Sequence, residues 1–375
     1  MSRVLLGDVA VEHKETCKGS KDGYPIVGLE HLIPEEITLT AWDEGSENTF
    51  SKMFRKGNVL FGRRRAYLKK AAVAPFDGIC SGDITVIEAK PDYILPELLP
   101  FIIQNDNLFD FAVGKSAGSL SPRVKWEHLK NYEFELPDME KQKELAELLW
   151  AMDNTKKSYQ KLIAATDELV KSQFMEQFGG REKGCYCTLE ECCVSVTGGS
   201  TPSMKREDYY GGNVPFIKSG DVKADYVSSG ALWLTQRALD ETTARYVPTG
   251  TVIVVTRSGI LKHDLPVAIT ANPVVINQDL KAFEPKPEFL PQYLAWAIRS
   301  KEDTLLSKTR AMTVDNIESR ELYEIPVMIA NIGEQEQFAA FVRQSDKSKF
   351  AVQSCSNLNF SGSLKRKGSH LIHVV

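Results

Sequence analysis

Residues 83–96 read DITVIEAKPDYILP and residues 279–291 read DLKAFEPKPEFLP, so one pattern occurs twice in this chain. In each copy an aspartate is followed by a glutamate, a Lys-Pro pair, an aromatic residue and a second proline. The copies begin 196 residues apart, at Asp83 and Asp279, a period too long for a solenoid and suited to a duplicated domain. We call them the first and second repeat segments, and they predict two copies of one domain design.

The residues before the repeat segments also match. Residues 57–63 read GNVLFGR and residues 250–257 read GTVIVVTR, in each case a turn glycine and an apolar strand that ends in arginine. A slip of one residue aligns Arg63 with Arg257. Short β-branched and apolar runs between turn residues predict strands, and proline-led apolar runs predict short helices. Each copy is therefore expected to be a mixed α and β domain, which gives an α+β chain.

The composition is that of an ordinary globular protein, with 42% hydrophobic and 26% charged residues. At 375 residues the chain exceeds the size at which one core keeps growing. It shows no secretory signal and no run of transmembrane length, so we expect a cytoplasmic location. The cysteines at 185, 187, 192 and 193 lack Cys-x-x-Cys spacing and a nearby histidine, which favours reduced thiols over zinc. No metal is expected.

Residues 139–178 predict one long helix, because apolar residues recur at heptad spacing without glycine or proline until Gly179. Its partner is expected to be a second helix that begins near Gly333, and the pair would form an antiparallel coiled coil with pseudo-twofold symmetry. The alternative is that each helix packs on its own domain. The expected coiled-coil contacts are Leu145, Leu148, Met152, Tyr159, Leu162, Leu169, Phe338, Phe341 and Val342.

Eight basic residues and no acidic residue occur between Lys52 and Lys70, although the net charge of the chain is −4. A solvated strand pair would normally interleave acidic residues, so this run favours contact with a polyanion.

The repeat segments also suggest a nuclease, because an aspartate, a glutamate and a lysine resemble a magnesium-binding set. Residues five apart on a strand point to opposite faces, so Asp83 cannot join Glu88 and Lys90 without a bulge. The chain also lacks an Asn/Asp-Pro-Pro-aromatic motif, an S-adenosylmethionine loop and a GxxxxGK[ST] phosphate loop. We therefore expect no catalytic residue.

Two similar units, each followed by a helix after an apolar-proline junction, and the helix end KSQFMEQFG at 171–179 resemble the specificity subunit of a type I restriction-modification system. The resemblance implies two target recognition domains that each read one half of a bipartite, asymmetric DNA target. It implies as partners double-stranded DNA, two methylation subunits and a restriction subunit, and no membrane. S-adenosylmethionine, ATP and Mg²⁺ would be bound by the partner subunits, and this chain would hold no cofactor.

Donor-rich segments that match between the two units are the expected DNA contacts. The candidates are Arg63, Arg64, Arg65, Lys69, Lys70, Lys115, Ser119, Arg123, Lys218, Arg257, Ser258, Lys262, His263, Lys308, Arg310 and Thr313. Two alternatives stay open: a two-domain coiled-coil adaptor that does not bind DNA, and a stand-alone nuclease.

The expected domains are a first target recognition domain over 1–138, a spacer helix over 139–180 and a second target recognition domain over 181–330. A shortened second spacer helix is expected over 331–353. The remaining residues, 354–375, are polar and rich in helix breakers, which predicts a disordered tail.

Overall fold

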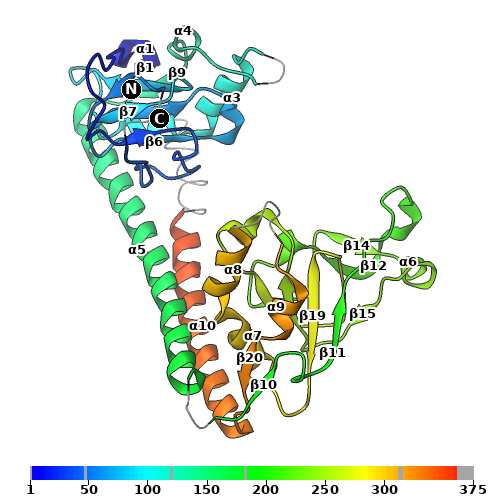
Figure 1. Ribbon diagram of the computed structural model, residues 1–375. Coiled ribbons are helices and arrows are strands. Elements are labelled where there is room, and N and C mark those ends of the chain that lie inside the picture. The colour runs from blue at the N-terminus through cyan, green and yellow to red at the C-terminus, as the bar shows by residue number, and fades with distance from the viewer. Residues whose placement is uncertain (1, 46–48, 119–120, 181–183, 311–315, 361–375) are drawn as a thin grey trace. The chain divides into compact units, whose positions relative to one another are not determined.

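The computed structural model describes residues 2–45, 49–118, 121–180, 184–310 and 316–360, without the side chains of 309, 310 and 350–360 (Figure 1). Its contacts divide the chain into unit 1, residues 1–161 with 352–375, and unit 2, residues 162–351. No helix in the described parts is long and apolar enough to cross a membrane.

Unit 1 is built from short strands around two apolar clusters. Its strands are β1 (Ser2–Leu5), β2 (Ala10–Glu12), β3 (Ile26–Val27), β4 (Lys52–Phe54), β5 (Val59–Gly62), β6 (Ala71–Val73), β7 (Gly78–Cys80), β8 (Ile84–Ala89) and β9 (Glu133–Leu136). They form the sheets β2-β8-β5-β6, β3-β7-β4 and β1-β9. The short helices are α1 (Leu6–Val9), η1 (Ala66–Leu68), α2 (Leu99–Ile103), α3 (Asp106–Gly114) and α4 (Trp126–Leu129). Phe61 of β5 stacks on Phe109 of α3 with ring centroids 5.5 Å apart, which ties the larger sheet to its covering helix.

Unit 2 has the same plan with additional strands. Its strands are β10 (Tyr186–Thr188), β11 (Cys193–Gly198), β12 (Tyr210–Ile217), β13 (Tyr226–Val227), β14 (Leu232–Leu234), β15 (Tyr246–Val247), β16 (Val252–Val255), β17 (Val267–Thr270), β18 (Val274–Ile276), β19 (Leu280–Pro285) and β20 (Pro326–Met328). Its sheets are β11-β19-β16-β17-β13, β14-β12-β18-β15 and β10-β20. The helical segments are η2 (Glu207–Tyr209), η3 (Ser219–Asp221), α6 (Gln236–Glu241), η4 (Gly259–Lys262), α7 (Pro291–Arg299), α8 (Glu302–Arg310) and α9 (Ser319–Tyr323).

The two strand orders confirm the duplication. The order β2-β8-β5-β6 corresponds to β11-β19-β16-β17, and β3-β7-β4 corresponds to β12-β18-β15. In both smaller sheets the central strand has one parallel and one antiparallel neighbour. The closing pairs β1-β9 and β10-β20 are both antiparallel. The mixed α and β units expected from the sequence are therefore present.

The sheet register corrects one sequence alignment. Gly62 pairs with Ile84 in unit 1, and Val255 pairs with Leu280 in unit 2. Because Ile84 and Leu280 each follow the aspartate of a repeat segment, the residue that matches Arg257 is Arg64. Alignment of Arg63 with Arg257 was wrong because it assumed a slip that the hydrogen-bonded strands do not contain.

Each repeat segment is tied to the start of a long helix by one buried glutamine. In unit 1 the Gln142 Oε1 accepts from the Leu95 N–H at 2.8 Å, and its Nε2 donates to the Pro137 carbonyl at 2.9 Å. In unit 2 the Gln335 Oε1 accepts from the Leu290 N–H at 2.8 Å, and its Nε2 donates to the Glu288 carbonyl at 2.9 Å. The repeat segments are therefore structural junctions between domain and helix.

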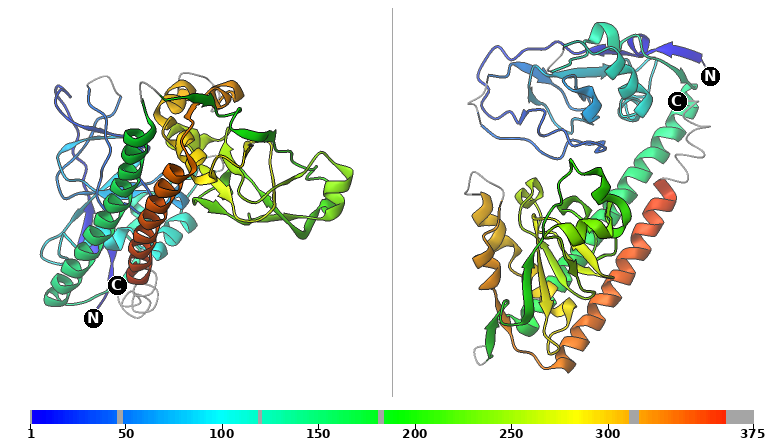
Figure 2. Two further views of the ribbon diagram at one scale, coloured as in Figure 1. Left: turned by 90° about the horizontal axis from the view of Figure 1, so that it is seen from below. Right: turned by 90° about the vertical axis from the view of Figure 1, so that its right-hand side faces the viewer.

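The long helices are α5 (Met139–Phe178) and α10 (Ile332–Phe360). Within unit 2 the last turns of α5 lie beside α10, as Figure 2 shows, with the Phe174 and Phe338 rings 5.2 Å apart. Further along, Lys349 Nζ of α10 lies 2.7 Å from Asp167 Oδ1 of α5. Because residue numbers rise along α10 as they fall along α5, these segments are antiparallel.

Three of the six residues predicted for the α5 side of the coiled coil are exposed. Leu148, Leu162 and Leu169 are 55%, 50% and 55% exposed. The buried face of α5 instead has Leu145 and Ala146 in the core of unit 1, and Val170, Phe174 and Phe178 in the core of unit 2. The heptad count failed because the first turns pack on their own domain and the last turns pack through aromatic residues. Met152 and Tyr159 are partly buried.

The residues predicted for the α10 side of the coiled coil are buried or partly buried. Phe338 and Val342 are buried in the core of unit 2, and Phe341 is partly buried against it. The helix continues to Phe360, so the expected end at Gln353 was too early. Residues 361–375, which make up the rest of the expected tail, lie outside the described part of the chain.

Candidate nucleic-acid interface

Two segments of unit 1 that the sequence singled out separately lie together. We call residues 63–70 turn 1 and residues 115–123 loop 1; residues 119 and 120 of loop 1 are outside the described residues. Arg64 Nε donates to Ser121 Oγ at 2.5 Å, and Arg64 forms a β-bridge with Arg123. The Arg65 N–H donates to the Pro122 carbonyl at 2.8 Å. Turn 1 and loop 1 therefore form one basic surface.

Asp83 holds two arginines of this surface in place. Arg123 Nε donates to Asp83 Oδ1 at 2.7 Å, and Arg64 Nη1 lies 3.4 Å from Asp83 Oδ2. The hydrogen bond from Arg123, with a smaller contribution from Arg64, lowers the pKa of the Asp83 carboxyl below its usual value. Because the pKa of Asp83 is lower in the folded state than in the unfolded state, its ion pairs stabilise the fold at any pH above the unfolded-state pKa. This stabilisation is lost as the pH falls through the folded-state pKa.

The other nuclease-like residues of the first repeat segment are engaged elsewhere. His13 Nδ1 lies 2.7 Å from a Glu88 carboxylate oxygen, and Lys90 Nζ donates to the Gly7 carbonyl at 2.8 Å. In the second repeat segment, Glu284 accepts from Ser195 Oγ at 2.8 Å. In the first repeat segment Asp83, Glu88 and Lys90 therefore have separate partners, which does not favour one shared metal site.

Turn 1 is a tight, ordered turn that displays part of its sequence to solvent. Its centre is η1, and the residues at either end of η1, Arg65 and Lys69, have positive φ values of 54° and 52°. Non-glycine residues seldom adopt this left-handed conformation, which costs energy and often accompanies function. The turn exposes Arg65, Tyr67 and Leu68. Tyr67 and Leu68 were not predicted as site residues, because the prediction followed the basic residues of this run.

The remaining basic side chains of unit 1 differ in whether they have protein partners. Lys69 forms an ion pair with Asp106, and Lys70 Nζ donates to the Leu29 carbonyl at 2.7 Å. Lys115 is exposed, with Nζ 5.8 Å from the centre of the Phe111 ring. The half-buried Arg63 has an Nε without a partner among the described residues. Lys70 is therefore partly structural, whereas Arg65 and Lys115 can reach a ligand.

Unit 2 presents the matching surface. We call residues 256–263 turn 2 and residues 308–316 segment 2, of which 308–310 belong to α8 and 311–315 lie outside the described residues. Arg257 is exposed and forms a β-bridge with Asn316, the counterpart of the Arg64 bridge to Arg123. Ser258 is partly buried, whereas Lys262, His263 and Ile260 are exposed. Ile260 was missed by the sequence prediction.

The other predicted residues of unit 2 are less informative. Lys308 Nζ lies 2.9 Å from Glu321 Oε1 on α9, so its charge is compensated. Lys218 follows β12 in the other sheet, away from turn 2 in the chain, and its N–H donates to Asp221 at 2.9 Å. Thr313 and Ser119 lie outside the described residues, as does the side chain of Arg310.

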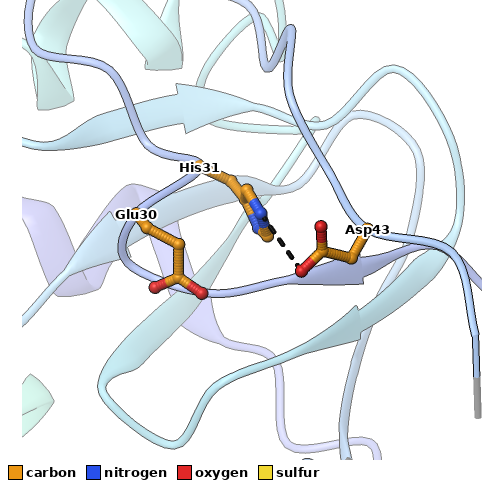
Figure 3. A group of neighbouring side chains, drawn as sticks. All are labelled: Glu30, His31 and Asp43. Atoms are coloured by element: carbon orange, nitrogen blue, oxygen red, sulfur yellow. Dashed lines mark ion pairs between the residues drawn. The ribbon is translucent and has the colours of Figure 1, made fainter. Parts of the chain in front are cut away.

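Glu30, His31 and Asp43 form the group in the described part of the chain that most resembles a metal site (Figure 3). The Gly28 N–H donates to His31 Nδ1 at 2.9 Å, so that nitrogen is an acceptor. The neutral ring then carries its proton on Nε2, which lies 3.5 Å from Asp43 Oδ2. A protonated Nε2 has no lone pair for a metal, so the geometry favours a hydrogen-bonded group that fixes this loop.

The chain matches the family described as type I restriction modification DNA specificity domain twice, over residues 6–165 and 186–355. A type I restriction enzyme specificity subunit of Escherichia coli is 29% identical over 152 residues, 40% of this chain and 38% of that protein. Another, from Methanocaldococcus jannaschii, is 30% identical over 156 residues, 40% of this chain and 35% of that protein. The aligned parts span less than half the length of either relative.

Two solved structures have a similar fold. A chain from work on complex assembly and conformational transition of the type I R-M system has a TM-score of 0.50 at 19% identity, with 96% of each chain covered. The S subunit of a type I restriction-modification system from M. genitalium has a TM-score of 0.51 at 12% identity, covering 96% of this chain and 92% of that one. At these identities the likeness concerns the fold alone.

Proposed function

Because this chain belongs to the type I restriction modification DNA specificity family, we propose that it is a specificity subunit that recognises a bipartite DNA target. Unit 1 reads one half of the target and unit 2 reads the other. The observation that carries the proposal is the repeated basic surface, in which Arg64 and Arg257 occupy equivalent places and form β-bridges to Arg123 and Asn316. Guanidinium groups at such a place suit phosphate contacts and bidentate guanine contacts.

The family indicates a non-catalytic role, and the chemistry then belongs to partner chains. We propose that methylation subunits, in two copies, and a restriction subunit bind this chain. They would bind S-adenosylmethionine, ATP and Mg²⁺, and the assembly would act in the cytoplasm. The exposed leucines Leu148, Leu162 and Leu169 share one heptad position on α5, with Thr155 between the first two, and would offer such a partner apolar contacts.

The first test is copurification of the full-length chain together with duplex binding at several salt concentrations. A DNA methyltransferase chain at about two copies supports the proposed assembly. For DNA binding, the logarithm of the association constant is expected to fall linearly with the logarithm of salt, because bound phosphates release counterions. Duplex binding that is absent or independent of salt would contradict the proposal and favour the two-domain adaptor.

A further inference from the structure

An exposed apolar residue stands at the same place in turn 1 and turn 2. The sheet registers equate Arg64 with Arg257, so the third residue beyond each arginine is Tyr67 in unit 1 and Ile260 in unit 2. Tyr67 is 55% exposed and Ile260 is 43% exposed. Single exposed apolar residues are common on protein surfaces, but equivalent positions in two divergent units are a stronger observation.

Both apolar residues are held by ordered turns. In unit 1 the Leu68 N–H donates to the Arg65 carbonyl at 2.9 Å, and Ala66 is buried beneath the turn. In unit 2 the Leu261 N–H donates to the Ser258 carbonyl at 3.1 Å, and Leu261 is fully buried. Each turn is thus anchored from below, and its apolar tip is presented outward in a defined position.

Each turn also joins two antiparallel strands and has cations beside its tip. Turn 1 connects β5 to β6, and turn 2 connects β16 to β17. The major groove of DNA admits a two-stranded ribbon, and only there does thymine display its C5-methyl group. The guanidinium groups that precede each tip, Arg65 in turn 1 and Arg257 in turn 2, would neutralise phosphates that border the groove.

We propose that the tips of turn 1 and turn 2 enter the major groove of their half-sites, where Tyr67 and Ile260 contact base edges. This inference rests on the proposed function and deepens it by naming residues that determine specificity. Ile260 has no hydrogen-bonding group, so it selects a base by apolar contact with the C5-methyl of thymine. The Tyr67 hydroxyl has no partner among the described residues, so it can donate to a base acceptor.

The test is selection of duplexes from a randomised DNA library by the full-length chain, together with any subunits that copurify with it. Wild type is compared with Ile260→Ala, Tyr67→Phe and Tyr67→Ala. Matched controls are Ile329→Ala and Tyr93→Ala, which remove exposed apolar side chains that belong to neither turn. The half-site read by the unaltered unit serves as an internal control for folding.

Ile260→Ala is expected to abolish the preference for thymine at one base pair of the unit 2 half-site and to leave the unit 1 half-site unchanged. Deoxyuridine at that position, which lacks only the methyl group, should weaken wild-type binding about fourfold and should not weaken binding by the variant. Tyr67→Phe and Tyr67→Ala should relax one position of the unit 1 half-site. Both controls should select the wild-type motif.

The possible failures are distinguishable. If wild type selects a bipartite motif and Ile260→Ala and Tyr67→Ala select the same motif, the tips do not read bases and this inference is wrong. A lost preference at a base pair without thymine would overturn the methyl contact of Ile260. If wild type selects no motif while it binds DNA weakly or not at all, the proposed function itself fails.

Discussion

Unit 1 and unit 2 share their scaffold and differ in their turns. The strand orders correspond, and Gln142 and Gln335 make equivalent hydrogen bonds to the two repeat segments. At the turns, by contrast, Tyr67 of unit 1 corresponds to Ile260 of unit 2. Asp83 binds two arginines, whereas Asp279 Oδ2 accepts a hydrogen bond from Asn277 at 2.8 Å. The difference indicates that the residues that build the fold are shared between the units, whereas the residues of the proposed DNA-contacting turns have diverged.

The glutamines give the largest expected effect, and it should be similar in both units. Gln142→Leu and Gln335→Leu each leave buried backbone groups without a partner, so each should lower the free energy of unfolding by about 3 kcal/mol. Thermal or urea denaturation of the full-length chain measures this. Gln337→Leu, at an exposed position of α10, is the control and should change stability by less than about 0.5 kcal/mol. A large effect in one unit alone would show that the two junctions are not equivalent.

Asp83→Asn and Asp279→Asn should have different effects, because only Asp83 binds arginines. Asp83→Asn keeps both arginines but removes the charge that positions them, so the ratio of specific to non-specific DNA affinity should fall about tenfold. Asp279→Asn should leave that ratio within about twofold, because its carboxylate has no arginine partner among the described residues. Fluorescence anisotropy with the selected duplex and a scrambled duplex measures both ratios. Equal losses in the two variants would mean that the aspartates act only on the scaffold.

The smallest effect on half-site affinity is expected from a change in α5 itself. Removing four residues between Lys156 and Glu168 shortens a helix by about 6 Å, which is roughly two base pairs of duplex. If α5 sets the spacing between half-sites, the selected motif should keep both halves and change its gap. An unchanged gap in the selected library would disprove a spacer role for α5.

Much of the fold was predictable because duplication leaves a signal in the letters. The repeat segments, the two mixed units and the presence of two long helices could be predicted from residue patterns, whereas the contact between turn 1 and loop 1 is seen only in the structure. The strand register could not be predicted, because the sequence does not show which residues pair by hydrogen bonds in a sheet. For this reason Arg63 was wrongly aligned with Arg257. The seam through Leu148 and Leu162 failed for a related reason: heptad spacing does not tell which surface covers a helix that packs on its own domain.

The sequence predicted the basic residues of the candidate site but not the exposed apolar residues of the two turns. The basic residues predicted the proposed DNA-contacting surface, and the structure shows which of the predicted side chains have protein partners, such as Lys70 and Lys308. Tyr67 and Ile260 could have been found only by aligning the turns without the one-residue slip. In that alignment Arg64 matches Arg257, and Tyr67 and Ile260 each lie three residues after the arginine. Their exposure depends on the turn conformation, which the sequence does not display.

The central claim is that each unit reads its own half of one DNA target. The most direct measurement is library selection by the full-length chain with Arg64→Ala and, separately, Arg257→Ala. Arg64→Ala should weaken binding by about 1–3 kcal/mol and relax only the unit 1 half-site, and Arg257→Ala should relax only the other, with the gap intact in both. If either variant alters both halves, or neither variant alters the selected sequence or the affinity at fixed salt, the account is contradicted.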